Sequence, residues 1–303
     1  MARTPRAAVK RPKAFVATNA PLALAPQRAT RPVAPVSRRE SKPMRLDEGQ
    51  GFGTEEREES ERPPSRPIRV AASGDLHARL DRPNRLQRIF REVNDQADIL
   101  LLAGDLTDHG DPDEAEQLAE EMSAVRVPIV AVLGNHDYEM GKADEVVRIL
   151  SRGGIRILDG GFFIFEKRLA IAGTKGFAGG FGRATLEPWG EEPIKRFVFE
   201  AVNESLKLES ALARIKDYPK RIALMHYAPV HGTVEGENPE LIPFLGCSRL
   251  AEPIDNFGAD FAVHGHAHKG RTQANTPGGI PVYNVAMKLL NHATGRRFVV
   301  VGV

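Results

Sequence analysis

The chain has 303 residues, and its 42 lysine and arginine side chains nearly balance 40 aspartate and glutamate side chains, so the formal net charge is only +2. This net charge is too small to indicate a nucleic-acid partner, and no apolar stretch approaches the ~20 residues needed to cross a bilayer. Cys247 is the only cysteine, which excludes an internal disulfide and a zinc site built from several thiolates. A single cysteine is typical of a reducing compartment, and we expect a cytoplasmic protein.

The N-terminal part of the chain differs in composition from the rest. Residues 1–45 are basic and rich in proline and alanine, with Glu40 as the only acid, and residues 47–61 are acidic. Neither stretch has enough clustered apolar residues to offset the entropy cost of ordering, so we predict a disordered arm over residues 1–66. A solvated tail is the favoured interpretation. An organelle transit peptide, or a segment that contacts nucleic acid or an anionic membrane, is an alternative.

From residue 68 onward, apolar runs alternate with segments of helical periodicity. In chain order the predicted elements are strand 68–72, helix 84–94, strand 98–103, helix 112–124, strand 128–133, helix 142–151, one or two strands within 162–172, helix 192–215, strand 221–226, a partial helix within 240–257, strand 260–264, and strands 281–286 and 297–301. This alternation predicts an α/β layered domain with a largely parallel sheet. In such a sheet, ligands bind at the carboxyl ends of the strands.

Five of the predicted strands are followed by residues that can bind metals or transfer protons. A lone histidine or Gly-Asp pair at a strand end is usually structural. Five such ends at one edge of a sheet instead indicate a functional site. The residues are Asp75 and His77 after the first strand, Asp105 and Asp108 after the second, Asn135, His136 and Asp137 after the third, His226 after the fourth, and His264, His266 and His268 after the fifth.

The candidate ligands are too numerous for one ion. Mixed nitrogen and oxygen donors without thiolate favour Mn, Fe, Zn, Ni or Co over Mg or Ca. Two such ions ~3.5–4 Å apart can clamp a phosphate and lower the pKa of a water between them. We therefore expect two divalent or trivalent transition-metal ions, Mn and/or Fe above all, with Zn, Ni or Co as alternatives. The donors come from Asp75, His77, Asp105, Asn135, His226, His266 and His268.

The same segments, in the same order, resemble the motifs of the calcineurin-like metallophosphoesterases. The motifs are Asp75-Leu76-His77, Gly104-Asp105-Leu106-Thr107-Asp108, Gly134-Asn135-His136-Asp137, the isolated His226, and Gly265-His266-Ala267-His268. The resemblance covers residues 68–302 and implies a four-layer α/β/β/α sandwich of two packed mixed sheets, in one domain over residues 67–303. Within it, we expect residues 155–173 and 281–302 to supply most of the second sheet.

The resemblance also implies a role for each site residue. His136 resembles the histidine that contacts the phosphate and protonates the leaving oxygen. Asp137 is interpreted as a partner that orients His136. Asp108 is interpreted either as a partner of a ligand such as His136 or as the cap of the helix that starts near residue 112. Side chains at Gly104 and Gly134 would crowd the ions or the substrate. The first metal would be bound by Asp75, His77 and His268, the second by Asn135, His226 and His266, and both by Asp105.

The implied function is hydrolysis of a phosphomonoester or phosphodiester, with a metal-bridging hydroxide as nucleophile and His136 as acid. The motif set is similar to the cyclic-nucleotide phosphodiesterase branch, so we expect a small-molecule phosphoester as substrate, with nucleotides as a candidate class. A non-catalytic scaffold on the same fold is the alternative. His264 falls outside the motif and is interpreted either as a residue that supports a ligand or as structural. The loops 174–190 and 227–250 are candidates for substrate contacts, although their residues are also typical of packed or solvated loop surfaces.

Overall fold

The computed structural model describes residues 66–303, which fold around two β-sheets. The strands of the first sheet are β1 (Arg69–Ser73), β2 (Ile99–Ala103), β3 (Ile129–Val132), β4 (Ile155–Ile157) and β11 (Val299–Gly302). Those of the second are β5 (Gly161–Phe165), β6 (Leu169–Gly173), β7 (Lys220–Leu224), β8 (Phe261–His264), β9 (Gln273–Asn275) and β10 (Pro281–Asn284). The orders are β11-β1-β2-β3-β4 and β5-β6-β7-β8-β10-β9. The predicted disordered arm lies outside the described residues except for Arg66.

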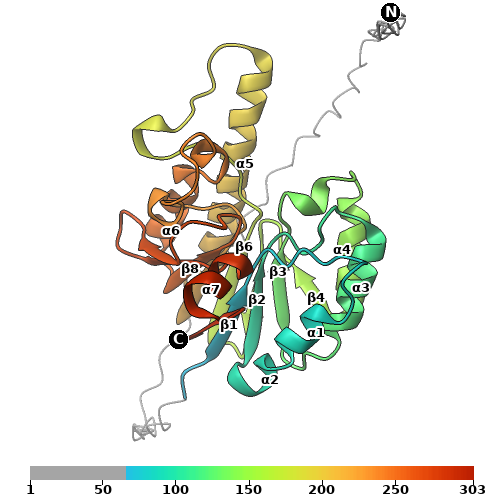
Figure 1. Cartoon of the computed structure of the whole chain (residues 1–303). Coiled ribbons are helices and arrows are strands. Elements are labelled where there is room, and N and C mark those ends of the chain that lie inside the picture. Colours follow the sequence, from blue (N-terminus) through green and yellow to red (C-terminus); the bar gives the residue numbers. More distant parts are fainter. Residues whose placement is uncertain (1–65) are drawn as a thin grey trace, which may run out of the picture. The chain divides into compact units, whose positions relative to one another are not determined.

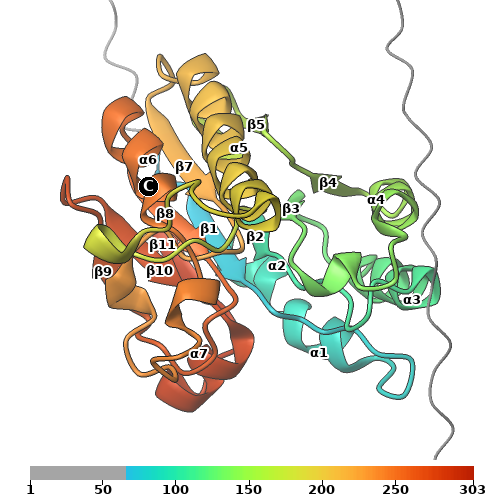
Figure 2. The same ribbon diagram turned by 90° about the horizontal axis from the view of Figure 1, so that it is seen from above.

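Helices cover the outer faces of both sheets. α1 (Arg85–Phe90), α2 (Val93–Gln96), α3 (Pro112–Met122) and α4 (Ala143–Arg152) lie beside the first sheet, and α5 (Glu192–Arg214) and α6 (Ala251–Phe257) lie beside the second (Figures 1 and 2). A further helix, α7 (Met287–Thr294), connects β10 to β11. The predicted four-layer sandwich of two mixed sheets is thus confirmed. None of the described helices is long and apolar enough to span a membrane.

The continuous apolar run of β2 reflects burial on both faces. Leu100 and Leu102 belong to the apolar cluster between the first sheet and its helices, whereas Ile99, Leu101 and Ala103 belong to the cluster between the two sheets. All five side chains are fully buried. Since burying one large aliphatic side chain contributes roughly 1.5–3 kcal/mol, this central strand fixes the position of its own carboxyl end firmly within the sandwich.

The parallel strands bring their carboxyl ends to one edge of the molecule. In the first sheet β1, β2, β3 and β4 are parallel to one another, and in the second β6, β7, β8 and β10 are parallel. The flanking strands β11, β5 and β9 pair antiparallel with their neighbours. The loops that follow β1, β2, β3, β7 and β8 therefore start from neighbouring points.

Three details of the predicted fold need correction. The helix expected over residues 84–94 is divided into α1 and α2. The backbone N–H groups of Asn94 and Asp95 donate to carbonyls three residues earlier instead of four. The Asn94 side-chain amide donates to Ala124 O, just after α3, at 2.9 Å. β4 and β11, expected in the second sheet, pair with β3 and β1 of the first. Alternation of apolar residues identifies a strand but does not tell which sheet it joins. β9 and α7 have no counterpart among the predicted elements.

Candidate metal centre

The seven predicted metal ligands follow five strands of the two sheets. Asp75 and His77 follow β1, Asp105 follows β2, Asn135 follows β3, His226 follows β7, and His266 and His268 follow β8. The first three of these strands belong to the first sheet and the last two to the second. The candidate site therefore lies where the carboxyl-end edges of the two sheets meet.

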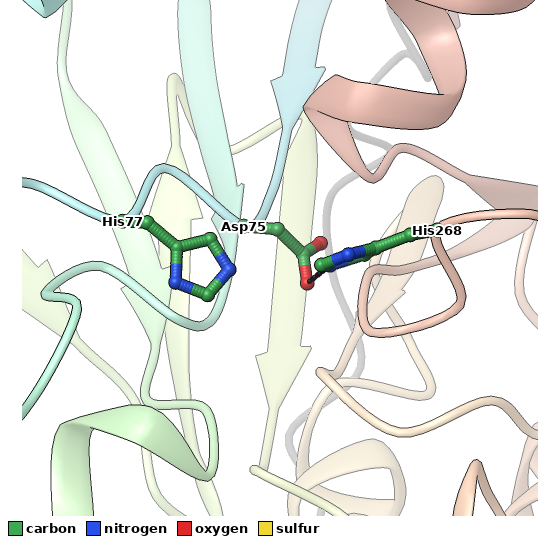
Figure 3. A group of neighbouring side chains, drawn as sticks. All are labelled: Asp75, His77 and His268. Atoms are coloured by element: carbon green, nitrogen blue, oxygen red, sulfur yellow. Dashed lines mark hydrogen bonds and ion pairs between the residues drawn. The ribbon is translucent and has the colours of Figure 1, made fainter. Parts of the chain in front are cut away.

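Asp75, His77 and His268 form the first of two ligand clusters, in which one ligand atom of each residue lies within 4.8 Å of the others. Figure 3 shows the two imidazoles on either side of the Asp75 carboxylate. His268 Nε2 lies 2.9 Å from Asp75 Oδ1, and the centroids of the two rings are 5.8 Å apart. The Asp75 carboxylate also accepts the backbone N–H of His266, at 2.9 and 3.0 Å. Two of the three residues thus come from the first sheet and one from the second.

Asp105, His226 and His266 form the second cluster, again with one ligand atom of each within 4.8 Å of the others. His226 Nε2 is its centre. This nitrogen lies 2.9 Å from Asn135 Oδ1 and 3.1 Å from His266 Nδ1. It also lies 3.4 Å from Asp105 Oδ1. Both sheets contribute to this cluster too, because Asp105 follows β2, whereas His226 and His266 follow β7 and β8.

The Asp105 carboxylate lies between the two clusters. Its Oδ1 is 3.4 Å from His226 Nε2 of the second cluster, and its Oδ2 is 3.9 Å from His77 Nε2 of the first. Oδ1 also accepts the backbone N–H of His136 at 2.9 Å, which fixes the orientation of the carboxylate. One carboxylate oriented toward two nitrogen-rich clusters has the arrangement expected of a bridge between two ions.

Backbone strain is concentrated at the candidate ligands. The φ angles of Asp75 (55°), His77 (43°), Asp105 (46°) and His266 (68°) lie in the left-handed region, which costs a non-glycine residue of the order of 1–3 kcal/mol. The strands end abruptly at these residues, and the unusual φ directs their side chains toward a common centre. Such strain is typical of functional sites.

Two glycines leave space that the ligands occupy. A Cβ at Gly104, where φ is +81°, would lie 2.5 Å from His226 Nδ1. A Cβ at Gly134 would overlap the Oδ1 and backbone nitrogen of Asp105. The sequence prediction that side chains at these two positions would crowd the site agrees with both contacts, and the group displaced in each case is a candidate ligand.

The electrostatics of the site fit cations. Burial lowers the pKa of His226 well below its ordinary value and that of His266 to about 3, so both rings are neutral and offer a lone pair. Burial, followed by the charges of Asp75 and Asp137, raises the pKa of Asp105. The hydrogen bond to Asp75 raises the pKa of His268. A buried carboxyl group whose pKa is raised, beside two neutral imidazoles, is a donor set in which bound cations would stabilise the deprotonated carboxylate.

His136 stands at the mouth of the site with its side chain one-third exposed (33%). Its Nδ1 lies 2.7 Å from Asp108 O and 3.1 Å from Glu139 Oε1. Because a carbonyl oxygen can only accept, Nδ1 carries a proton there. Nε2 lies 4.0 Å from Asp105 Oδ2, and the ring meets that of His77 edge-on at 4.6 Å. His136 is thereby oriented with Nε2 toward the candidate metal centre.

The Asp108 carboxylate contacts a different histidine from the one expected. Its Oδ1 lies 3.0 Å from His77 Nδ1, although the angle does not make a hydrogen bond, and its Oδ2 lies 3.4 Å from Arg79. His136 is contacted by the backbone carbonyl of Asp108 and not by its carboxylate within residues 66–303. The cap of α3 is Asp111, whose side chain accepts from Asp113 N at 3.1 Å, so the alternative role of Asp108 as helix cap is wrong.

Asp137 has a structural position rather than the one expected beside the imidazole of His136. It is fully buried, and its carboxylate accepts the backbone N–H groups of Leu106, Thr107 and Gly134 at 2.8–3.2 Å and the Thr107 hydroxyl at 2.6 Å. No hydrogen bond between its carboxylate and His136 occurs within residues 66–303. Adjacent residues on a turn point in different directions, and Asp137 fastens the loop after β2 to the loop after β3.

Two contacts of the site have only a weak signal in the sequence. Glu139 directly follows the short 3-10 helix His136–Tyr138, and its carboxylate contacts the His136 ring. The i,i+3 spacing of the two residues could have indicated this contact. The Tyr227 ring packs on His266 with centroids 4.5 Å apart. His264, interpreted as supporting a ligand or as structural, is fully buried and contacts Gly265 O at 2.7 Å and Thr233 Oγ1 at 2.8 Å.

The two candidate substrate loops are largely engaged in packing. Lys175 lies against the rings of Tyr138, Phe177 and Tyr227, with Nζ 4.7–5.7 Å from their centroids. Arg249 forms an ion pair of 3.0 Å with Glu187. The side chain of Trp189 is 66% exposed. Exposed residues of these loops, such as Trp189, stay candidates for substrate contacts.

Comparison with known proteins identifies a family and related folds. A family model described as calcineurin-like phosphoesterase matches residues 68–270. A 3′,5′-cyclic-nucleotide phosphodiesterase of Nostoc sp. is 30% identical over 83 residues, which cover 23% of this chain and 31% of that protein. The chain therefore matches about a third of the length of this curated relative.

Solved structures share the fold. A phosphopantetheinyl hydrolase of Mycobacterium tuberculosis has a TM-score of 0.57 at 15% identity, over 78% of this chain and 96% of that chain. The protein TT1561 of Thermus thermophilus has a TM-score of 0.50 at 16% identity, over 78% and 99% of the two chains. These identities are low, so the likeness shows the fold alone. The family model, in contrast, covers most of the chain and includes all seven predicted ligands, and the chain belongs to the calcineurin-like phosphoesterase family.

Proposed function

We propose that this phosphoester hydrolase works with two transition-metal ions, Mn and/or Fe above all, one held by each ligand cluster, with Asp105 as the ligand between them. The observation that carries the proposal is the position of Asp105, whose carboxylate oxygens lie 3.4 Å from His226 Nε2 and 3.9 Å from His77 Nε2. Bound there, two ions would polarise the phosphate and lower the pKa of the attacking water. The nitrogen and oxygen donors match the preferences of Mn and Fe and leave Zn, Ni and Co as alternatives.

His136 is the proposed general acid. Asp108 O and Glu139 hold its Nδ1 at 2.7 and 3.1 Å, which leaves Nε2 directed toward the centre. A proton carried on Nε2 would pass to the leaving oxygen of the ester as its bond to phosphorus breaks. A general acid in this position contributes ~10²–10⁴-fold to the rate.

The proposed substrate is a small organic phosphoester, with nucleotides as the favoured class. Support comes from the similarity of part of this chain to a cyclic-nucleotide phosphodiesterase, over 23% of its length. Diesters and monoesters are both candidate substrates. The cytoplasmic location and the contacts of the N-terminal arm stay predictions.

The experiment is a hydrolysis screen of the Mn²⁺-loaded protein against bis(p-nitrophenyl) phosphate, p-nitrophenyl phosphate and cyclic AMP. His136→Ala is expected to lower kcat by ~10²–10⁴-fold while two metal ions per chain remain bound. Asp105→Asn is expected to lose both bound metal and activity, because it removes the carboxylate that contacts both clusters. Metal content is measured by mass spectrometry of the dialysed protein.

His292→Ala is the matched control, since His292 is exposed in the last turn of α7 and should leave kcat and metal content unchanged. Full activity of Asp105→Asn would contradict the shared-carboxylate arrangement. Failure of the unmutated protein to hydrolyse any of the three esters with Mn, Fe, Zn, Ni or Co would instead favour the non-catalytic scaffold.

A further inference from the structure

A hollow of about 380 Å³ adjoins the first ligand cluster. Asp75, His77 and His268 form part of its wall. Much of the remaining wall is cationic and comes from the segment before α1, from α1 itself, and from α7 and the turn after it. We call this feature the basic hollow, and its cationic residues are Arg79, Arg82, Arg85, Lys288 and Arg297.

The positive charge of the basic hollow is only partly neutralised. Arg79 is paired with Asp81 at 3.0 Å and Asp108 at 3.4 Å. The other four cations form no salt bridge with a carboxylate of residues 66–303. Arg85 is half-buried, and its burial and the charges of Arg82 and Arg297 lower its pKa. Like charges are thus held near one another, and a bound anion would relieve their repulsion.

The basic hollow is attached to the same loop that carries two ligands of the first cluster. The Arg85 guanidinium donates to the carbonyl oxygens of Leu76 and His77, the latter at 3.3 Å. At the other wall, Met287 N at the start of α7 donates to Gly74 O at 2.9 Å. The Ser73 hydroxyl donates to Arg297 O at 2.8 Å. These bonds tie both cationic walls to residues 73–77, and so set their distance from the metal centre.

We propose that the substrate carries a second phosphate group, which binds in the basic hollow while the scissile phosphate lies at the metal centre. The proposal rests on the proposed function and names the class of its substrate. Guanidinium and ammonium groups are the side chains that bind phosphate oxygens most strongly. Arg82 and Lys288 are exposed and their side chains form no hydrogen bond within residues 66–303, so they are available to a ligand. Arg85 lies deeper and orients the loop.

The test is a binding measurement with two matched ligands, thymidine 3′,5′-bisphosphate and thymidine 5′-monophosphate. Calorimetry uses the Mn²⁺-loaded full chain with His136→Ala, so that turnover is slow. We expect the bisphosphate to bind at least about tenfold more tightly. The double variant Arg82→Gln/Lys288→Gln in the same background should reduce this ratio to about one and leave the Kd of the monophosphate nearly unchanged.

The matched control is Arg148→Gln/Arg152→Gln, which removes two exposed cations from α4 on another face of the domain. It should keep the full preference for the bisphosphate. Equal Kd values of the two ligands in the parent protein would overturn the proposal. So would a preference that survives in Arg82→Gln/Lys288→Gln. Binding is measured without turnover, so the two proposals can fail separately. If the bisphosphate is preferred but the unmutated protein hydrolyses no ester, the proposed function is wrong and the phosphate site stands.

Discussion

The substitution Gly134→Ala tests whether the space beside Asp105 is required for metal binding. A Cβ at this position would overlap Asp105 Oδ1 and would lie 2.8 Å from Asp105 Cγ. Real Cβ contacts are rarely closer than 3.4 Å, so the carboxylate must shift by at least about 0.6 Å, whereas metal–ligand distances vary by only about ±0.2 Å. The backbone nitrogen of Asp105 blocks part of this shift, because it too would overlap the added methyl group.

We expect Gly134→Ala to weaken metal binding by about 10–100-fold, the usual effect of disturbing a group that orients a ligand. Crowding a packed interior also costs about 1–3 kcal/mol of folding stability. Metal affinity is measured by competition with a chelator, activity by hydrolysis of bis(p-nitrophenyl) phosphate, and stability by urea unfolding of the metal-free protein.

Gly161→Ala is the matched control for this prediction. Neither glycine has a positive φ, and the nearest atom to a Cβ at Gly161 is Leu158 Cδ2 at an ordinary 3.8 Å. This variant should bind metal and hydrolyse ester as the unmutated protein does. If Gly134→Ala retained two ions of unchanged affinity and full activity, the assignment of Asp105 as the shared ligand would be refuted.

Three further predictions concern carboxylates around the site and at the opposite end of the first sheet. Hydrogen bonds from two arginines lower the pKa of Asp98 in the folded protein. The ionised carboxylate therefore stabilises the fold above the unfolded-state pKa, and this stabilisation is lost as the pH falls through the folded-state pKa. Asp98→Asn should lower the free energy of unfolding by about 1–2 kcal/mol at pH 7, and urea titrations should show a smaller loss below about pH 4. A cost that is the same at pH 7 and pH 3 would contradict the pairing. Asp137→Asn should destabilise the protein by about 2–4 kcal/mol, because the new amide N–H₂ group faces backbone donors; a change of less than about 0.5 kcal/mol in unfolding free energy would be inconsistent with its four hydrogen bonds. Glu139→Gln should lower kcat about tenfold at unchanged metal content, since it weakens the support of His136; an unchanged kcat would remove Glu139 from the site.

The sequence was sufficient to predict that the candidate ligands gather at one edge, because each of them directly follows a strand in the chain. A run such as residues 98–103 ends in Gly104-Asp105, and parallel strands must deliver their ends to one edge. The convergence of Asp105 with His77 and His226 follows from that rule and from the resemblance to the family. The candidate ligands could therefore be named from the layer architecture and the family motifs, without knowledge of side-chain contacts.

The supporting contacts could not be predicted in the same way. Asp108 and Asp137 each lie close in the chain to a predicted ligand, but the direction of each side chain depends on a turn whose conformation the sequence does not specify. Asp137 turns inward to backbone N–H groups, and Asp108 divides its carbonyl and its carboxylate between two histidines. Arg85 reaches the loop of His77 from a helix eight residues further along, a contact that only the tertiary structure creates.

The division of the candidate ligands between the two sheets has a consequence for the proposed binding of metal. Neither sheet alone supplies a whole candidate cluster, because His268 joins Asp75 and His77 from the other sheet, and His226 joins Asp105 in the same way. A partly folded chain in which only one sheet has formed would have no high-affinity site. Metal ions would then bind late in folding, after the two sheets have packed together, and each bound ion would stabilise the packing of one sheet on the other.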